Sequence, residues 1–240
     1  MRKTMAVVIR TVDFKDNDRM ITFLTKDYGL MSAKVRGAKK QTSKLFSASS
    51  MFCCGEYTFY EKNGFYGVRG SDIKYTFGHV QDDYDAYAVA CFVADVSGKV
   101  AQEDYAAPKT FALAVNALWA LDKGAAMPKA VACYFVQRLL MLEGVYPELN
   151  NCMVCGSGEY LSKMSLEHGG VVCKNCEGGK RVEKSVVKAL RDMQDVMPSE
   201  INKVAFEKGT EAKLLRLLVD YLEYVLQKPL MTSKFIFGEK

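Results

Sequence analysis

The sequence predicts an α+β multidomain protein, with a five-stranded β-barrel followed by an all-α domain that carries a small cysteine-bearing insert. Short alternating apolar runs fill the first 80 residues, apolar residues then recur at helical spacing, and four of the eight cysteines gather near residues 150–180. A length of 240 residues suits one or two domains. The expected domains are 1–80 and 81–240. A composition of 49% hydrophobic and 25% charged residues excludes a disordered chain.

The barrel is predicted from five β-branched or aromatic runs that are separated by turn signals. The runs are 4–12, 19–25, 30–36, 51–60 and 65–77. Lys15 to Asp18 and Tyr28-Gly29 read as turns, and Asn63-Gly64 is a hairpin signal. Five short strands in so little sequence match the strand count of an OB-fold barrel.

The helical part begins after His79, where three aspartates precede an apolar stretch to Val96 and suit the first turn of a helix. Prolines open or close the helices that follow, as their missing N–H group favours. The expected helices are about 108–121, 128–144, 185–196 and 210–227, with Thr210 as the N-cap of the last.

No apolar run approaches the length of about 18 residues that a membrane helix requires. The first residues lead into an alternating segment and lack the apolar core of a signal peptide. We therefore expect a cytoplasmic protein without membrane association.

The net charge of +5 is unevenly distributed. Residues 1–80 hold 14 Lys and Arg against 7 Asp and Glu, whereas residues 81–150 hold 5 against 9. A basic N-terminal third suggests a polyanionic partner such as nucleic acid, and a solvated surface without a partner is the alternative.

A basic loop follows the third expected strand, and small residues keep its backbone accessible. Its five cations are Lys34, Arg36, Lys39, Lys40 and Lys44. We expect them to contact DNA phosphates and to release counterions on binding. Aromatic residues interleave the strands; we expect most of them to fill the barrel and some to stack on bases.

The four clustered cysteines read C-x2-C, seventeen residues, C-x2-C. They are Cys152, Cys155, Cys173 and Cys176. Two such knuckles supply four thiolates in a tetrahedron, which predicts a closed, structural Zn²⁺ site that folds residues 150–180 as a zinc ribbon. A rubredoxin-like iron site and a redox dithiol pair are the alternatives. Cys53, Cys54, Cys91 and Cys133 lie in apolar contexts and read as buried thiols.

Catalytic motifs are missing from the sequence. It contains no Walker A loop, no G-x-S-x-G, no H-E-x-x-H and no G-x-G-x-x-G, and it has only two histidines. We therefore expect no enzymatic activity.

Several segments, in the same order along the chain, resemble the RecO family of DNA repair proteins. They are the run 25–30 with the G-A-K-K loop at 35–40, the Leu-rich segment 135–149 leading into the first knuckle, and the tail 229–235. Together they span nearly the whole chain.

The resemblance implies an OB-fold, a helical domain, an inserted zinc ribbon and the role of a recombination mediator in the RecFOR pathway. Such proteins bind single- and double-stranded DNA and anneal complementary strands without ATP. They engage the single-stranded-DNA-binding protein SSB and the partner RecR, and they help to load RecA onto SSB-coated DNA. The resemblance also implies a nucleoid-associated location in bacteria. It carries the family's basic loop onto Arg36, Lys39 and Lys40 and its zinc ligands onto the four clustered cysteines.

Two other functions compete with this interpretation. One is a zinc-ribbon regulator that binds nucleic acid without annealing it, and the other is an interaction protein with no nucleic-acid affinity. Steep salt dependence of binding would exclude the latter.

Overall fold

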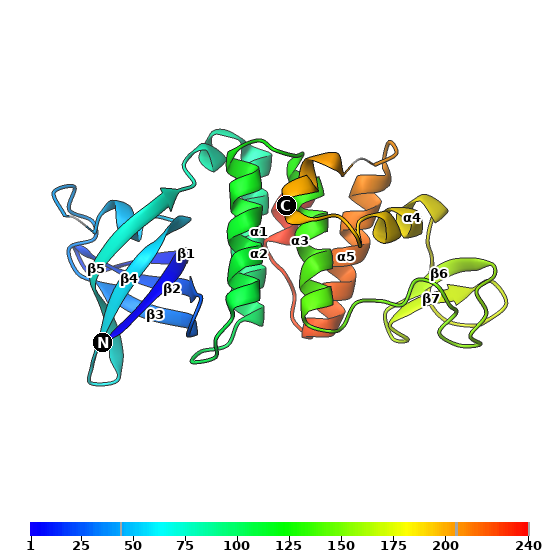
Figure 1. Cartoon of the computed structure of the whole chain (residues 1–240), viewed down its shortest axis with the longest axis horizontal. Coiled ribbons are helices and arrows are strands. Elements are labelled where there is room, and N and C mark those ends of the chain that lie inside the picture. The colour runs from blue at the N-terminus through cyan, green and yellow to red at the C-terminus, as the bar shows by residue number, and fades with distance from the viewer. Residues whose placement is uncertain (44, 205, 240) are drawn as a thin grey trace. The chain divides into compact units, whose positions relative to one another are not determined.

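The computed structural model describes residues 1–43, 45–204 and 206–239. The chain forms two compact units (Figure 1). One comprises Met1–Gly124 with the C-terminal segment from Lys234, and the other comprises Ala125–Ser233. Across the described residues, no helix combines the length and the apolar character needed to cross a bilayer.

Five of the strands that the structure describes close into a barrel. They are β1 (Arg2–Phe14), β2 (Asp18–Thr25), β3 (Gly29–Val35), β4 (Cys53–Lys62) and β5 (Phe65–Thr76). Their order around the barrel is β1-β2-β3-β5-β4, with β3 parallel to β5 and β4 closing onto β1. This meander followed by a closing hairpin is an OB-fold, so the predicted barrel is confirmed.

Alternation along the strands places large apolar side chains inside the barrel. Phe23, Tyr57 and Phe59 are almost fully buried, and the ring centroids of Phe23 lie 4.7 Å from Tyr57 and 5.2 Å from Phe59. The Tyr57 hydroxyl donates a 2.7 Å hydrogen bond to the carbonyl of Ala48, which satisfies its polar atom inside the core. These three rings therefore fill the core of the barrel, and the outer face is formed by other side chains.

Two helices, α1 (Tyr84–Val100) and α2 (Pro108–Asp122), belong to the same unit as the barrel. The Asp83 side chain caps α1 by accepting a 2.8 Å hydrogen bond from the Ala86 N–H. Asp122 accepts hydrogen bonds from the Tyr75 hydroxyl at 2.8 Å and from the His79 N–H at 2.9 Å, which ties α2 to the end of β5. The domain boundary expected at residue 80 stays a prediction, since this compact unit extends beyond it.

The second unit contains three α-helices, a 3-10 helix at Pro198–Lys203 and a small three-stranded sheet within the described residues. The helices are α3 (Pro128–Leu142), α4 (Lys184–Asp192) and α5 (Thr210–Leu226), and the sheet comprises β6 (Leu161–Ser165), β7 (Gly170–Cys173) and β8 (Lys180–Arg181). A buried amide, Gln137 on α3, donates a 2.8 Å hydrogen bond to the carbonyl of Leu190 on α4. A short helix, α6 (Ser233–Phe237), lies near the C-terminus.

Two details of the helices differ from the prediction. The expected helix 185–196 ends at Asp192, and residues 193–195 form a turn ahead of Pro198. Thr210 is the first helical residue of α5 and is buried, whereas Gly209 is the N-cap with φ of 81°. Glycine adopts this left-handed conformation without a steric cost, so it ends the preceding turn where threonine would be strained.

Candidate nucleic-acid interface and metal centre

The end of β3 and the loop that follows it form the candidate nucleic-acid interface. Arg36 and Lys40 are exposed, while Lys34 and Lys39 are partly buried. Lys44, the fifth predicted contact, lies outside the described residues. Among the described residues, no carboxylate forms an ion pair with Arg36 or Lys40, so these two cations are available to a phosphate.

The other two cations are already paired with carboxylates of the β1–β2 hairpin. Lys34 Nζ lies 2.9 Å from an Asp18 oxygen, and Lys39 Nζ lies 3.1 Å from an Asp13 oxygen. Strand register explains the pairing, because Arg19 is opposite Asp13 on β1 and opposite Val35 on β3. The sequence alone does not give this register, so the two carboxylates were missed.

The same hairpin holds the backbone of the loop. The Gly37 N–H donates a 2.9 Å hydrogen bond to the Asp18 carboxylate, and the Lys39 N–H donates a 3.1 Å bond to the Asn17 carbonyl. The bond from Gly37 and the pairing with Lys34 hold the pKa of Asp18 below its usual value. Pairing with Lys39 and Arg19 does the same for the pKa of Asp13. The loop is therefore anchored with its backbone fixed, and Arg36 and Lys40 project into solvent.

A second group of exposed cations lies in the other unit. Lys180 and Arg181 form β8, and Lys184 begins α4. Glu183 interrupts the group and pairs with Lys213 at 2.5 Å. This group is the next place to look for DNA contacts if the basic loop makes none.

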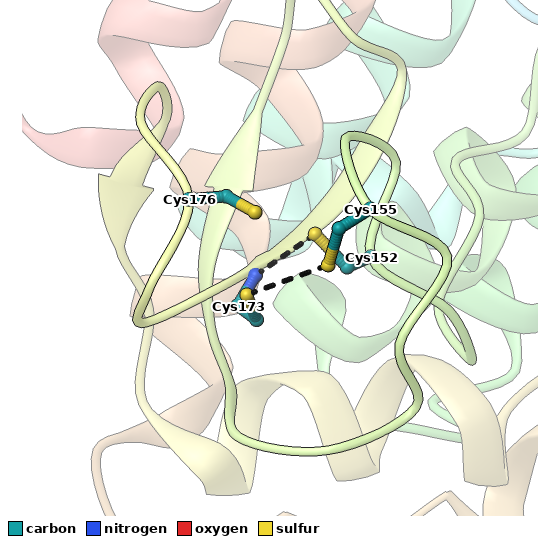
Figure 2. A group of neighbouring side chains, drawn as sticks. All are labelled: Cys152, Cys155, Cys173 and Cys176. Carbon is teal, nitrogen blue, oxygen red and sulfur yellow. Dashed lines mark hydrogen bonds between the residues drawn. The ribbon is translucent and has the colours of Figure 1, made fainter.

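The candidate metal centre lies in the small sheet and its preceding loop. Cys152 and Cys155 form the first knuckle, Cys173 ends β7, and Cys176 follows in the next turn (Figure 2). Figure 2 shows the four sulfur atoms pointing toward one another. The predicted fourfold cluster is therefore assembled by two separate segments of chain.

The cluster has the size of a tetrahedral thiolate site. All four sulfur atoms lie within 4.8 Å of one another, and the Cys155 and Cys173 sulfurs are 3.9 Å apart. Zinc–sulfur bonds of about 2.3 Å in a tetrahedron imply sulfur–sulfur separations of about 3.8 Å. The side chains therefore fit a single metal ion such as Zn²⁺.

Backbone groups prepare the cluster for a cation. The Cys173 N–H donates a 3.3 Å hydrogen bond to the Cys152 sulfur, and with the N–H groups of Cys155 and Val154 it lowers the pKa of Cys152 to about 6. Hydrogen bonds with the Cys155 and Cys173 thiols raise the pKa of Cys176 to about 12. A bound metal would replace the protons of the thiols that hold it.

The remaining cysteines lie outside this cluster. Cys53, Cys54 and Cys133 are buried and Cys91 is half-buried. Burial raises the pKa of Cys54 to about 11, as for an inert thiol in an apolar core. The prediction that these residues pack as small apolar side chains is confirmed for the three buried ones.

Comparison with known proteins covers almost the whole chain. The family model described as Recombination protein O N terminal matches residues 1–77, and that described as Recombination protein O C terminal matches residues 81–234. The first match is the barrel, and the second contains the helices and the cysteine cluster.

Curated relatives over the full length carry one name, DNA repair protein RecO. The chain is 30% identical to that of Exiguobacterium sibiricum, over 92% of this chain and 90% of the relative. It is 25% identical to that of Listeria monocytogenes, over 98% of this chain and 94% of the relative. It is 23% identical to that of Caldanaerobacter subterraneus, over 97% of this chain and 96% of the relative. The chain therefore belongs to the RecO family of DNA repair and recombination proteins.

Proposed function

We propose that this protein is a non-enzymatic recombination mediator of the RecFOR pathway. It binds single- and double-stranded DNA, anneals complementary strands without ATP and helps to load RecA onto SSB-coated DNA. SSB and RecR are its protein partners, and its place is the bacterial cytoplasm at the nucleoid. Membership of the RecO family and a sequence without a nucleotide-binding motif support this proposal.

One observation carries the DNA-binding part of the proposal, namely the anchored loop that presents Arg36 and Lys40 to solvent on an OB-fold barrel. Cations on a fixed backbone hold phosphates without losing much conformational freedom, and each contact releases counterions. Lys34 and Lys39 lie in the same segment, and each is already paired with an aspartate. Such contacts carry no sequence information, as a protein that anneals any complementary pair requires.

Structural zinc is the second part of the proposal. Cys152, Cys155, Cys173 and Cys176 would hold the ion, and four thiolates leave no position open for a reacting water. The ion would cross-link the two knuckles beside a small apolar cluster, in which Val172 is buried and Leu161 is partly buried.

Charge reversal of the basic loop tests the proposed function. Wild-type protein should accelerate annealing of bare complementary oligonucleotides without ATP. Conversion of Arg36, Lys39 and Lys40 to Glu should weaken binding to both DNA forms and slow annealing for every base sequence tested. Annealing that the triple variant supports at the wild-type rate would contradict the proposed site. Binding without annealing in the wild type would favour the zinc-ribbon regulator instead.

A further inference from the structure

The four cysteines of the candidate metal centre differ in their exposure to solvent. Cys152 and Cys173 are only 2% and 3% exposed, and Cys176 is half-buried, whereas Cys155 is exposed. A small solute therefore reaches the cluster most easily at Cys155. A closed site that only cross-links two knuckles does not need an exposed ligand, so this asymmetry requires an explanation.

The exposed cysteine has a buried partner close by. The Cys155 sulfur lies 3.9 Å from the Cys173 sulfur, and Figure 2 shows the two side chains pointing toward each other from separate segments. A disulfide bond is about 2.05 Å long, so the two sulfurs would approach by about 2 Å. That is a movement on the scale of side-chain rotation.

The cysteines outside the cluster are protected from solutes. Cys53, Cys54 and Cys133 are buried in apolar surroundings, and Cys91 is half-buried. Thiols in such surroundings are inert, whereas a metal site holds its cysteines as thiolates, which are the nucleophilic form. An oxidant that enters from solvent should therefore react at the cluster before it reacts elsewhere in the chain.

We propose that the cysteine cluster is a peroxide-sensitive switch, in which hydrogen peroxide joins Cys155 to Cys173 and the metal ion is released. The inference rests on the structural zinc of the proposed function and adds regulation to that site. It differs from a simple dithiol pair because the oxidation state of the thiols decides whether the metal is held.

The chemistry takes two steps. The Cys155 thiolate attacks one oxygen of hydrogen peroxide, the O–O bond breaks, and Cys155 becomes a sulfenic acid as hydroxide leaves. The Cys173 thiolate then attacks the sulfur of that sulfenic acid, so that the S–S bond forms and a second hydroxide leaves. The two thiolates lose two electrons and the peroxide gains them, and two protons from solvent convert the hydroxides into water.

The disulfide leaves the cluster with only Cys152 and Cys176 as free thiolates, which are too few for a tetrahedral site. The knuckles are joined to the small sheet, since the Met153 N–H donates a 2.9 Å hydrogen bond to the Val171 carbonyl on β7. Loss of the ion should therefore loosen the sheet of β6, β7 and β8. The basic loop belongs to the other compact unit, so the switch acts on the second unit.

The test treats zinc-loaded wild-type protein with hydrogen peroxide and measures released zinc with a chromogenic chelator. About one ion per chain should be released, and a dithiol reductant with added zinc should restore the bound state. Tryptic mapping by mass spectrometry identifies the bond, because cleavage at Lys163 and Lys174 separates Cys155, Cys173 and Cys176 into three peptides. The expected disulfide joins the first peptide to the second, and fragmentation of the linked pair should place it on Cys155.

Cys155→His is the informative variant, because histidine is also a zinc ligand but offers no thiol to the oxidant. This variant should bind zinc and release it about ten-fold more slowly, or slower still. Cys91→Ser removes a half-buried thiol outside the cluster and is the matched control. It should release zinc at the wild-type rate.

The outcomes separate this inference from the proposed function. Wild-type protein that holds no zinc before oxidation would refute the structural zinc itself. Zinc that stays bound in excess peroxide, or that leaves without a disulfide between Cys155 and Cys173, would overturn the switch and leave the zinc site standing. Release from Cys155→His at the wild-type rate would overturn it as well. The disulfide map is made on wild-type protein, so it decides the matter even if Cys155→His holds no ion.

Discussion

Neutralising the two unpaired cations of the basic loop gives a prediction whose size follows from the structure. Arg36 and Lys40 are exposed, and no ion pair joins either to a carboxylate of the described chain. We predict that Arg36→Gln with Lys40→Gln removes two phosphate contacts and leaves the loop anchored, because Asp18 and Asn17 hold its backbone through Gly37 and Lys39.

The salt dependence of binding gives the number of phosphate contacts that the variant has lost. Each phosphate contact contributes about 0.7 to the slope of log K against log salt for single strands and about 0.9 for duplex. Two lost contacts should therefore flatten the slope by about 1.4 for single strands and about 1.8 for duplex. Between about 50 and 200 mM salt, wild-type affinity for a single strand should fall about seven-fold further than that of the variant.

Fluorescence anisotropy across a salt series measures the slope directly. Lys26→Gln with Lys109→Gln is the matched control, because it removes the same charge from exposed positions. Lys26 precedes β3 and Arg36 follows it, so the seven residues of the strand separate them by about 20 Å. A variant slope equal to that of the wild type, or an equal flattening in the control, would refute the assignment of phosphate contacts to this loop.

Three further predictions concern the metal centre and stability. We expect wild-type protein to hold about one zinc ion per chain, and Cys155→Ser should abolish this content and expose residues 150–180 to proteolysis. Cys91→Ser, outside the cluster, should do neither. Zinc retained by the Cys155→Ser variant would contradict the ligand set. Gly29 has a φ of +61°, and Gly29→Ala would place a Cβ 1.9 Å from the Gln102 carbonyl oxygen. The change should cost about 2 kcal/mol of stability and lower the Tm by about 4–8 °C. An unchanged Tm would mean that the segment after α1 does not pack against Gly29. Burial raises the pKa of Glu211, so the folded state favours its protonated form and loses stability as pH rises through that pKa. Glu211→Gln should therefore raise the Tm at about pH 7 and lose this advantage near about pH 4, and a difference independent of pH would contradict the sign.

The barrel was readable from the sequence because local signals repeat at each strand. Alternation marks the strands, and the Asn63-Gly64 turn joins the last two with both residues at positive φ. Predicted and observed strand ends differ by at most two residues, as for the run 4–12 against Arg2–Phe14. The ligand set of the metal centre was readable for a similar reason, since both knuckles are local patterns of fixed spacing.

Features that depend on pairing between distant strands were not readable. Whether Lys34 and Lys39 are free or paired depends on the register that brings Asp18 and Asp13 beside them. The three strands of the metal-binding insert are five, four and two residues long, which is too short for an apolar alternation to mark them in the sequence.

Annealing of complementary strands coated with the cognate SSB, without ATP, tests the central claim most directly. A recombination mediator must act on DNA that SSB already covers, so wild-type protein should accelerate this reaction and the Arg36, Lys39 and Lys40 charge-reversal variant should not. No acceleration by wild-type protein that still binds bare DNA would contradict the mediator function. The chain would then be a member of the RecO family that binds nucleic acid without annealing it.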